Sequence, residues 1–143
     1  MPDELFMPTI RERPVGGKAP WRPQSIFYPA FFGGPLAAAT LGVLNGRRLA
    51  LPAGQLLIIA AAGLAAFAAR IAVTGSLADN SSARLTGTIA GVLVWLVVLA
   101  FQRRPFRAFS YADGTPAGLI GAGFAAFLGC GLFEAIVIYA LVR

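Results

Sequence analysis

A single carboxylate stands inside the last apolar segment of the chain, in the stretch GLFEAIVIYALVR at residues 131–143. A charged side chain at the centre of a bilayer costs at least about 2.5 kcal/mol, so Glu134 needs a partner. Four interpretations suit it: an ion pair between helices, a contact with a partner protein, a proton or cation site in a transport pathway, or a charge near enough to the membrane interface to be hydrated. Arg70 and Arg84, in other apolar segments, are the candidate cations.

Small residues indicate where these charges point. They recur at helical spacing on the faces that carry Arg84 and Glu134, at Gly87, Gly91, Gly123 and Gly131. Glycine lets membrane helices approach closely, so each face predicts a helix–helix contact. We therefore expect the charges to point into a bundle, where Glu134 forms a structural ion pair with Arg70 or Arg84.

Enzyme chemistry has little support in the sequence. The chain has no histidine and one cysteine, so the usual haem and metal ligands and histidine-based nucleophile pairs are missing. Its six acids are scattered, and its one lysine, Lys18, lies outside any phosphate-binding motif. We expect no enzymatic activity and no cofactor of its own. Bound lipids, or a pigment or cofactor held by a partner, stay open.

The composition is that of an integral membrane protein. Of its 143 residues, 57% are hydrophobic and 13% are charged, whereas soluble domains carry about 25% charged residues. Four apolar segments, at residues 25–45, 54–74, 84–102 and 115–142, each have about the 20 residues that cross a bilayer. Short connections favour antiparallel neighbours. The sequence therefore predicts an all-α, up-down bundle of four transmembrane helices over residues 25–143.

Proline marks two features near the start of the chain. Residues 1–24 contain five prolines, which predicts an extended or disordered N-terminal arm with no signal peptide. Further on, Gly33, Gly34 and Pro35 interrupt the first apolar segment and predict a helix kink. Such a kink serves packing, or it creates a half-helix whose N-terminus attracts an anion.

Aromatic and cationic side chains mark the expected contacts with lipids or partners. Tryptophan is enriched at membrane interfaces, and arginine meets the phosphates of lipid head groups. The positions concerned are Trp21, Arg103, Arg104, Phe106, Arg107 and Tyr111. The net charge of +6 suits anionic lipids. Nucleic-acid binding is not expected, because no polar face carries a basic stripe interleaved with aromatics.

These features favour a non-catalytic accessory subunit of a larger membrane complex of the respiratory, photosynthetic or secretion type. Its partners would be other integral membrane subunits and lipids, and homo-oligomers stay open. The alternative is a homo-oligomeric small transporter or ion channel that uses Glu134. Four crossings place both termini on one side, and the cations before the first segment favour a cytoplasmic side in a bacterial inner membrane.

Overall fold

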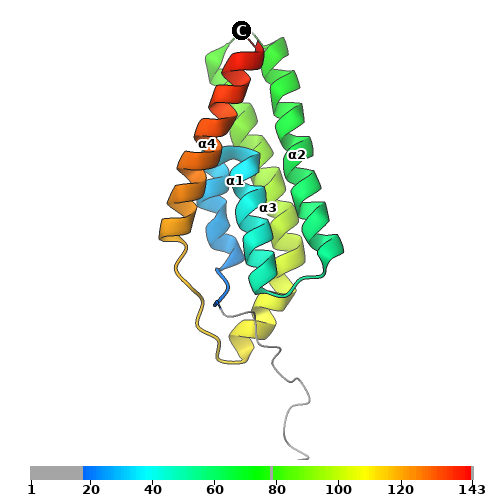
Figure 1. Ribbon diagram of the computed structural model, residues 1–143, viewed down its shortest axis with the longest axis vertical. Coiled ribbons are helices and arrows are strands. Elements are labelled where there is room, and N and C mark those ends of the chain that lie inside the picture. The colour runs from blue at the N-terminus through cyan, green and yellow to red at the C-terminus, as the bar shows by residue number, and fades with distance from the viewer. Residues whose placement is uncertain (1–17, 78, 143) are drawn as a thin grey trace, which may run out of the picture.

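The computed structural model describes residues 18–77 and 79–142, so most of the predicted N-terminal arm lies outside the described residues. The main elements are the helices α1 (Phe27–Arg48), α2 (Ala53–Ser76), α3 (Asn80–Tyr111) and α4 (Ile120–Val142), and a short 3-10 turn, Pro23–Ile26, leads into α1 (Figure 1). Four helical segments are long and apolar enough to cross a membrane. The predicted all-α membrane class is therefore confirmed.

The first of these helices reverses direction in its middle. Gly34 has φ 81° and ψ −168°, outside the helical region, and Figure 1 shows residues 27–33 rising and residues 35–48 returning beside them. Two hydrogen bonds fix this hairpin at its base. The amide of Trp21 donates to Asn45 Oδ1 at 2.7 Å, and Asn45 Nδ2 donates to the carbonyl of Trp21 at 3.0 Å. A straight helix would separate these residues by about 36 Å.

The local sequence explains why the reversal falls at this position. Only glycine adopts the conformation of Gly34 without strain. Pro35 follows as the first residue of the returning helix, a position where its missing N–H costs nothing and its fixed φ suits helix entry. The returning half has 14 residues, about 21 Å of helix, so its tip lies within the ~30 Å hydrocarbon core.

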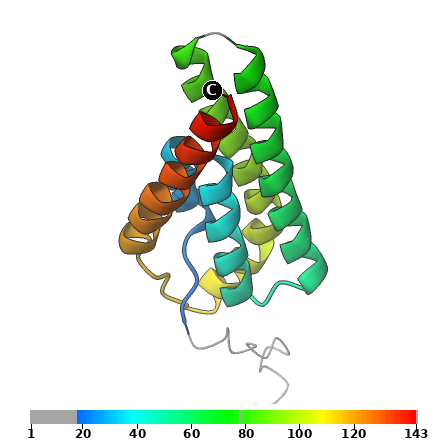
Figure 2. The same cartoon turned by 45° about the horizontal axis from the view of Figure 1, so that its top comes forward.

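The hairpin changes the predicted topology. The expected up-down bundle treats residues 25–45 as one crossing, but the chain enters and leaves at the same end of the molecule, which we call the base. Lys18 therefore lies at the base and Val142 at the opposite end, beyond three full-length helices (Figures 1 and 2). The expectation that both ends share one side is wrong for the described residues, because the sequence pattern does not distinguish a hairpin from a crossing.

Two predicted boundaries also differ from the structure. Helix α3 continues to Tyr111 instead of ending near residue 102, and α4 begins at Ile120 instead of residue 115. Pro105 lies inside α3 and removes only one hydrogen bond, so the arginine-rich segment stays helical. The chain then crosses the base, where the amide of Ala117 donates to the carbonyl of Pro20 at 3.0 Å.

The hairpin forms the centre of the molecule, and the other helices surround it (Figure 2). In the most apolar 18-residue stretch of each helix, 61% of the residues are buried in Pro23–Arg48, but only 11% in α2 and in α4. Helix α3 packs against the hairpin so closely that a Cβ on Gly91 would overlap the carbonyl of Ala30. This arrangement shields a non-helical backbone from lipid, which membrane proteins require.

Replacing Gly34 by alanine tests the hairpin. The φ of 81° disfavours any side chain, and a Cβ there would lie 2.6 Å from Glu134 Oε2. We expect Gly34→Ala to lower the free energy of unfolding by about 2 kcal/mol, measured by thermal unfolding in mild detergent. Gly54→Ala is the control, since a Cβ on Gly54 meets nothing within 4 Å. Equal melting temperatures for both variants would rule out the constrained reversal.

Candidate functional site

The carboxylate of Glu134 lies at the tip of the hairpin. Its side chain is fully buried, and Oε2 accepts a hydrogen bond from Arg70 Nη1, which also makes an ion pair. The other oxygen, Oε1, accepts from the backbone amide of Leu36 at 2.8 Å. Because Pro35 has no N–H, Leu36 supplies the first free amide of the returning half-helix. Glu134 therefore caps that helix and places negative charge at its positive end.

Helix α3 satisfies the opposite end of the break. The hydroxyl of Thr88 donates to the carbonyl of Phe31 at 3.2 Å, near the C-terminal end of the rising half-helix, where carbonyls lose their helical partners. The neighbouring Gly87 leaves room for Arg70, since a Cβ there would lie 2.5 Å from the guanidinium carbon. A donor and an acceptor from other helices thus satisfy one backbone group on each side of the break.

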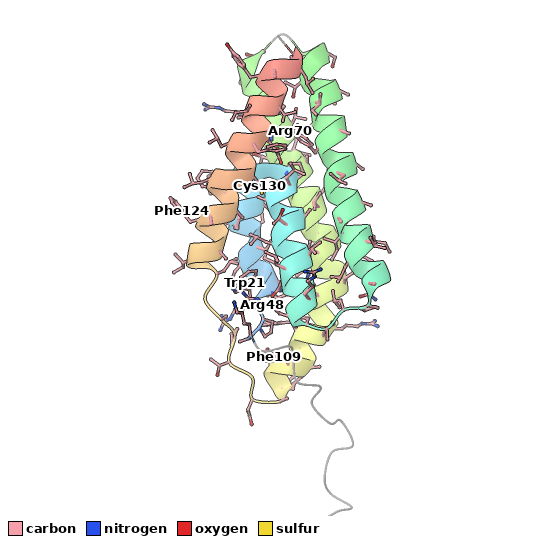
Figure 3. All side chains as sticks on the ribbon, viewed as in Figure 1. Trp21, Arg48, Arg70, Phe109, Phe124 and Cys130 are labelled. Atoms are coloured by element: carbon pink, nitrogen blue, oxygen red, sulfur yellow. The ribbon has the colours of Figure 1, made fainter. Side chains whose placement is uncertain are left out.

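All four helices meet at this point, which we call the tip cluster: Gly34 and Leu36 of α1, Arg70 of α2, Gly87 and Thr88 of α3, and Glu134 of α4. Figure 3 shows Arg70 at the height of the hairpin tip. Arg70 Nε and the hydroxyl of Thr74, one turn further along α2, are buried without a partner among the described residues. Within the cluster, each oxygen of the Glu134 carboxylate accepts one hydrogen bond from the protein.

Of the two candidate cations, the structure brings only Arg70 to Glu134. Arg84 lies one turn after the start of α3, and its side chain is exposed. No ion pair within the described ranges 18–77 and 79–142 includes it. A position one turn from a helix end lets a long cationic side chain reach water, so Arg84 does not need an internal partner.

A second polar cluster closes the base of the hairpin. Asn45 and Gln102 are fully buried, and Asn45 Nδ2 donates to Gln102 Oε1 at 2.8 Å. Gln102 Nε2 donates to the carbonyl of Gly42. The sequence pattern did not predict this cluster. The available signal was a side-chain amide near the end of each of two apolar segments, because such amides pair with each other inside a membrane protein.

Trp21 contributes to this base and not to a lipid contact. It is only 4% exposed, which overturns its predicted role at the membrane surface. The guanidinium of Arg48 lies 3.8 Å from the centre of its ring, and Arg48 Nη1 donates to the carbonyl of Ala19 at 2.9 Å (Figure 3). The hydrogen bonds between the Trp21 backbone and the Asn45 side chain hold Trp21 inside, because these polar groups lose contact with water once the hairpin packs above them.

The other predicted contact residues lie in the last turns of α3. The exposed members are Arg103, Arg104, Arg107 and Tyr111, while Phe106 is half-buried. The arginines and the aromatic rings belong to a helix that continues past the apolar core, not to the expected loop. Their side chains can meet head groups from that helix.

The predicted close-packing glycines face the interior of this chain. Gly87 accommodates Arg70 and Gly91 accommodates Ala30. On α4, a Cβ on Gly123 would lie 3.3 Å from Pro29 Cγ, and one on Gly131 would lie 3.6 Å from Gly33 Cα. Gly91 lets α3 approach α1, Gly123 and Gly131 let α4 approach it, and Gly87 makes room for a side chain of α2. The contact of α4 with Gly33 also explains the second glycine before Pro35, since a Cβ on Gly33 would lie 3.1 Å from Phe127 Cα.

The chain matches no protein-family model, and no curated protein or solved structure shows significant similarity to it. Fold likeness would in any case not establish an activity. The function is therefore argued from the geometry of the tip cluster, the base and the outer faces.

Removing one member of the ion pair tests the tip cluster. Arg70→Met leaves the carboxylate without its cation, and Glu134→Gln leaves the cation without its carboxylate. A buried charge without a partner is strongly destabilising, so each variant should lose about 3 kcal/mol of unfolding free energy. The double variant should lose less than the sum, because no uncompensated charge remains.

Thermal unfolding in mild detergent measures all three variants. Asp113→Asn serves as the control, since Asp113 is an exposed acid that follows α3. Additive losses in the double variant would contradict a direct pairing of Arg70 with Glu134.

Proposed function

We propose that this protein is a non-catalytic structural subunit of a larger membrane assembly, of the respiratory, photosynthetic or secretion type. The tip cluster supports this role because the intramembrane charges Arg70 and Glu134 are used to join the four helices. A chain held rigid in this way offers fixed outer faces to neighbours. Transport chemistry would instead need a carboxylate that can exchange its partners.

The observation that carries the proposal is the small-residue character of two outward faces. On α4, Gly121, Ala125 and Gly129 are exposed at spacings of four, and a Cβ on either glycine meets nothing within 4 Å. On α2, an exposed stripe of alanines follows helical spacing: Ala61, Ala65, Ala68 and Ala72. Small residues at such spacing favour close contact between membrane helices, and lipid alone does not require them.

The distribution of charge supports one orientation in a bacterial inner membrane. Because the hairpin brings both ends of α1 to the base, the base carries most cations of the described chain, namely Lys18, Arg22, Arg47, Arg48, Arg103, Arg104 and Arg107. The opposite end carries Arg84. Positive residues are retained on the cytoplasmic side, so we place the base in the cytoplasm and Val142 on the far side.

The alternative is a homo-oligomeric transporter or channel, and one observation favours it. A half-helix N-terminus inside the membrane, next to paired charges, is an arrangement that transporters use to bind ions. Arg70 Nε and the Thr74 hydroxyl also lack partners among the described residues. Against this, both oxygens of the Glu134 carboxylate accept hydrogen bonds from the protein, one from Arg70 Nη1 and one from the amide of Leu36.

Co-purification from the native membrane tests the structural role. We expect foreign membrane subunits to stay with the tagged chain in mild detergent, as measured by native mass spectrometry. Gly121→Leu combined with Gly129→Leu should reduce the recovered partner several-fold, because leucine keeps helices apart. Ala100→Leu is the matched control on the exposed face of α3. A homo-oligomer without foreign subunits, with ion flux in liposomes that Glu134→Gln abolishes, would contradict the proposal.

A fusion at the C-terminus tests the orientation. A reporter active only outside the cytoplasm, such as alkaline phosphatase, should be active when joined after the last residue. One active only in the cytoplasm, such as green fluorescent protein, should be dark there. The reverse pattern would show that the base faces outward.

A further inference from the structure

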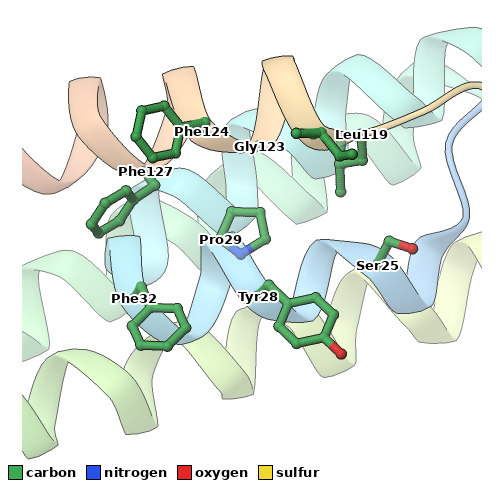
Figure 4. Close-up of a pocket in the computed structure, with 9 residues that line it drawn as sticks. Ser25, Tyr28, Pro29, Phe32, Leu119, Gly123, Phe124 and Phe127 are labelled. Atoms are coloured by element: carbon green, nitrogen blue, oxygen red, sulfur yellow. The ribbon is translucent and has the colours of Figure 1, made fainter.

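An apolar groove runs along the outer side of the molecule, between the rising half of α1 and the first turns of α4 (Figure 4). Its volume is 490 Å³, within the range of small-molecule sites of roughly 300–1,000 Å³. Pro29, Phe32, Phe124 and Phe127 contribute apolar side chains. Because these residues belong to the hairpin and to α4, which lie within the apolar part of the bundle, the groove lies at the depth of lipid acyl chains.

The groove continues into a polar pocket at the base. Ser25 and Tyr28 line both, and the polar pocket has a volume of 660 Å³. Its other polar side chains are the guanidinium of Arg22, the amide of Gln24 and the hydroxyl of Ser110. The residues that line it include one cation and several hydrogen-bond donors, but no acid. A lining of this kind suits an anion.

The surroundings of the polar pocket have the same sign of charge. Cationic side chains gather at the base around Arg22, and Asp113 is the acid at this end within residues 18–77 and 79–142. The pocket lies where the apolar segments end, so it is at the level of the head groups. Apolar above and cationic below, the combined groove complements a molecule with a hydrocarbon tail and an anionic head.

We propose that this groove binds one anionic phospholipid. An acyl chain lies between α1 and α4 against Pro29, Phe32 and Phe124, and the phosphate meets Arg22, with Ser25, Tyr28 and Ser110 as hydrogen-bond donors. A second copy of this chain would not provide the required anion, since its own base is equally cationic. The site does not depend on the structural role proposed above, and it applies to the chain by itself.

Lipid titration followed by native mass spectrometry tests the site on the full chain in mild detergent. The probes are phosphatidylglycerol and phosphatidylcholine with identical acyl chains. We expect the first phosphatidylglycerol molecule to bind more tightly than the first phosphatidylcholine molecule. Arg22→Gln should weaken binding of the first phosphatidylglycerol by roughly fivefold, the factor expected for one cation near a head group, and should weaken phosphatidylcholine binding less, because the choline cation of that lipid offsets its phosphate.

Two further variants separate this site from general attraction to the base. Arg104→Gln removes an exposed cation from the same end without touching the groove, and it should leave the first binding event unchanged. Ser25→Trp fills the junction of the two parts and should weaken both lipids. Equal losses for Arg22→Gln and Arg104→Gln, or no preference for phosphatidylglycerol in the unaltered chain, would overturn the proposal.

Discussion

The structure depends on one constraint: a helix broken inside a membrane must find partners for the backbone groups that the break exposes. Water is absent there, so each unsatisfied amide or carbonyl costs several kcal/mol. In this chain the carboxylate of Glu134 accepts from Leu36, and the hydroxyl of Thr88 donates to Phe31. The rest of the bundle is arranged so that these two side chains reach the break.

That constraint explains why the charges and the glycines occur together. Glu134 can remain ionised in a dry interior only beside a cation, and Arg70 of the opposite helix supplies it. The guanidinium needs space next to α3, which Gly87 provides. The ion pair, the helix break and the glycine positions therefore depend on one another. Neither the charges nor the broken backbone would be stable alone in a bilayer.

The hairpin also sets the electrical character of the two ends. Had residues 27–48 crossed the membrane, the cations before α1 and those after it would lie on opposite sides. The reversal collects Arg22, Arg47 and Arg48 at the base, where α3 adds its terminal arginines. A strongly cationic base and a nearly neutral opposite end provide both an orientation signal and an environment for anionic head groups.

The sequence by itself determined the class of the protein, three of its long helices and the candidate partners of its intramembrane carboxylate. Hydropathy reports how apolar a segment is, and helical spacing reports which residues share a face. Those properties identified residues 54–74 as a helix, named Arg70 as a candidate cation for Glu134, and located a helix irregularity at Gly33, Gly34 and Pro35. They are local, so one sequence window contains them.

Only the tertiary structure decided that the irregularity is a full reversal, that Arg70 and not Arg84 meets Glu134, and that Trp21 lies inside. A kinked helix and a hairpin have the same length and composition. The choice between them is made by contacts distant in sequence, such as Asn45 with Trp21 and Glu134 with Leu36. Those hydrogen bonds form only after separate helices have packed, which is why no reading of single segments could supply them.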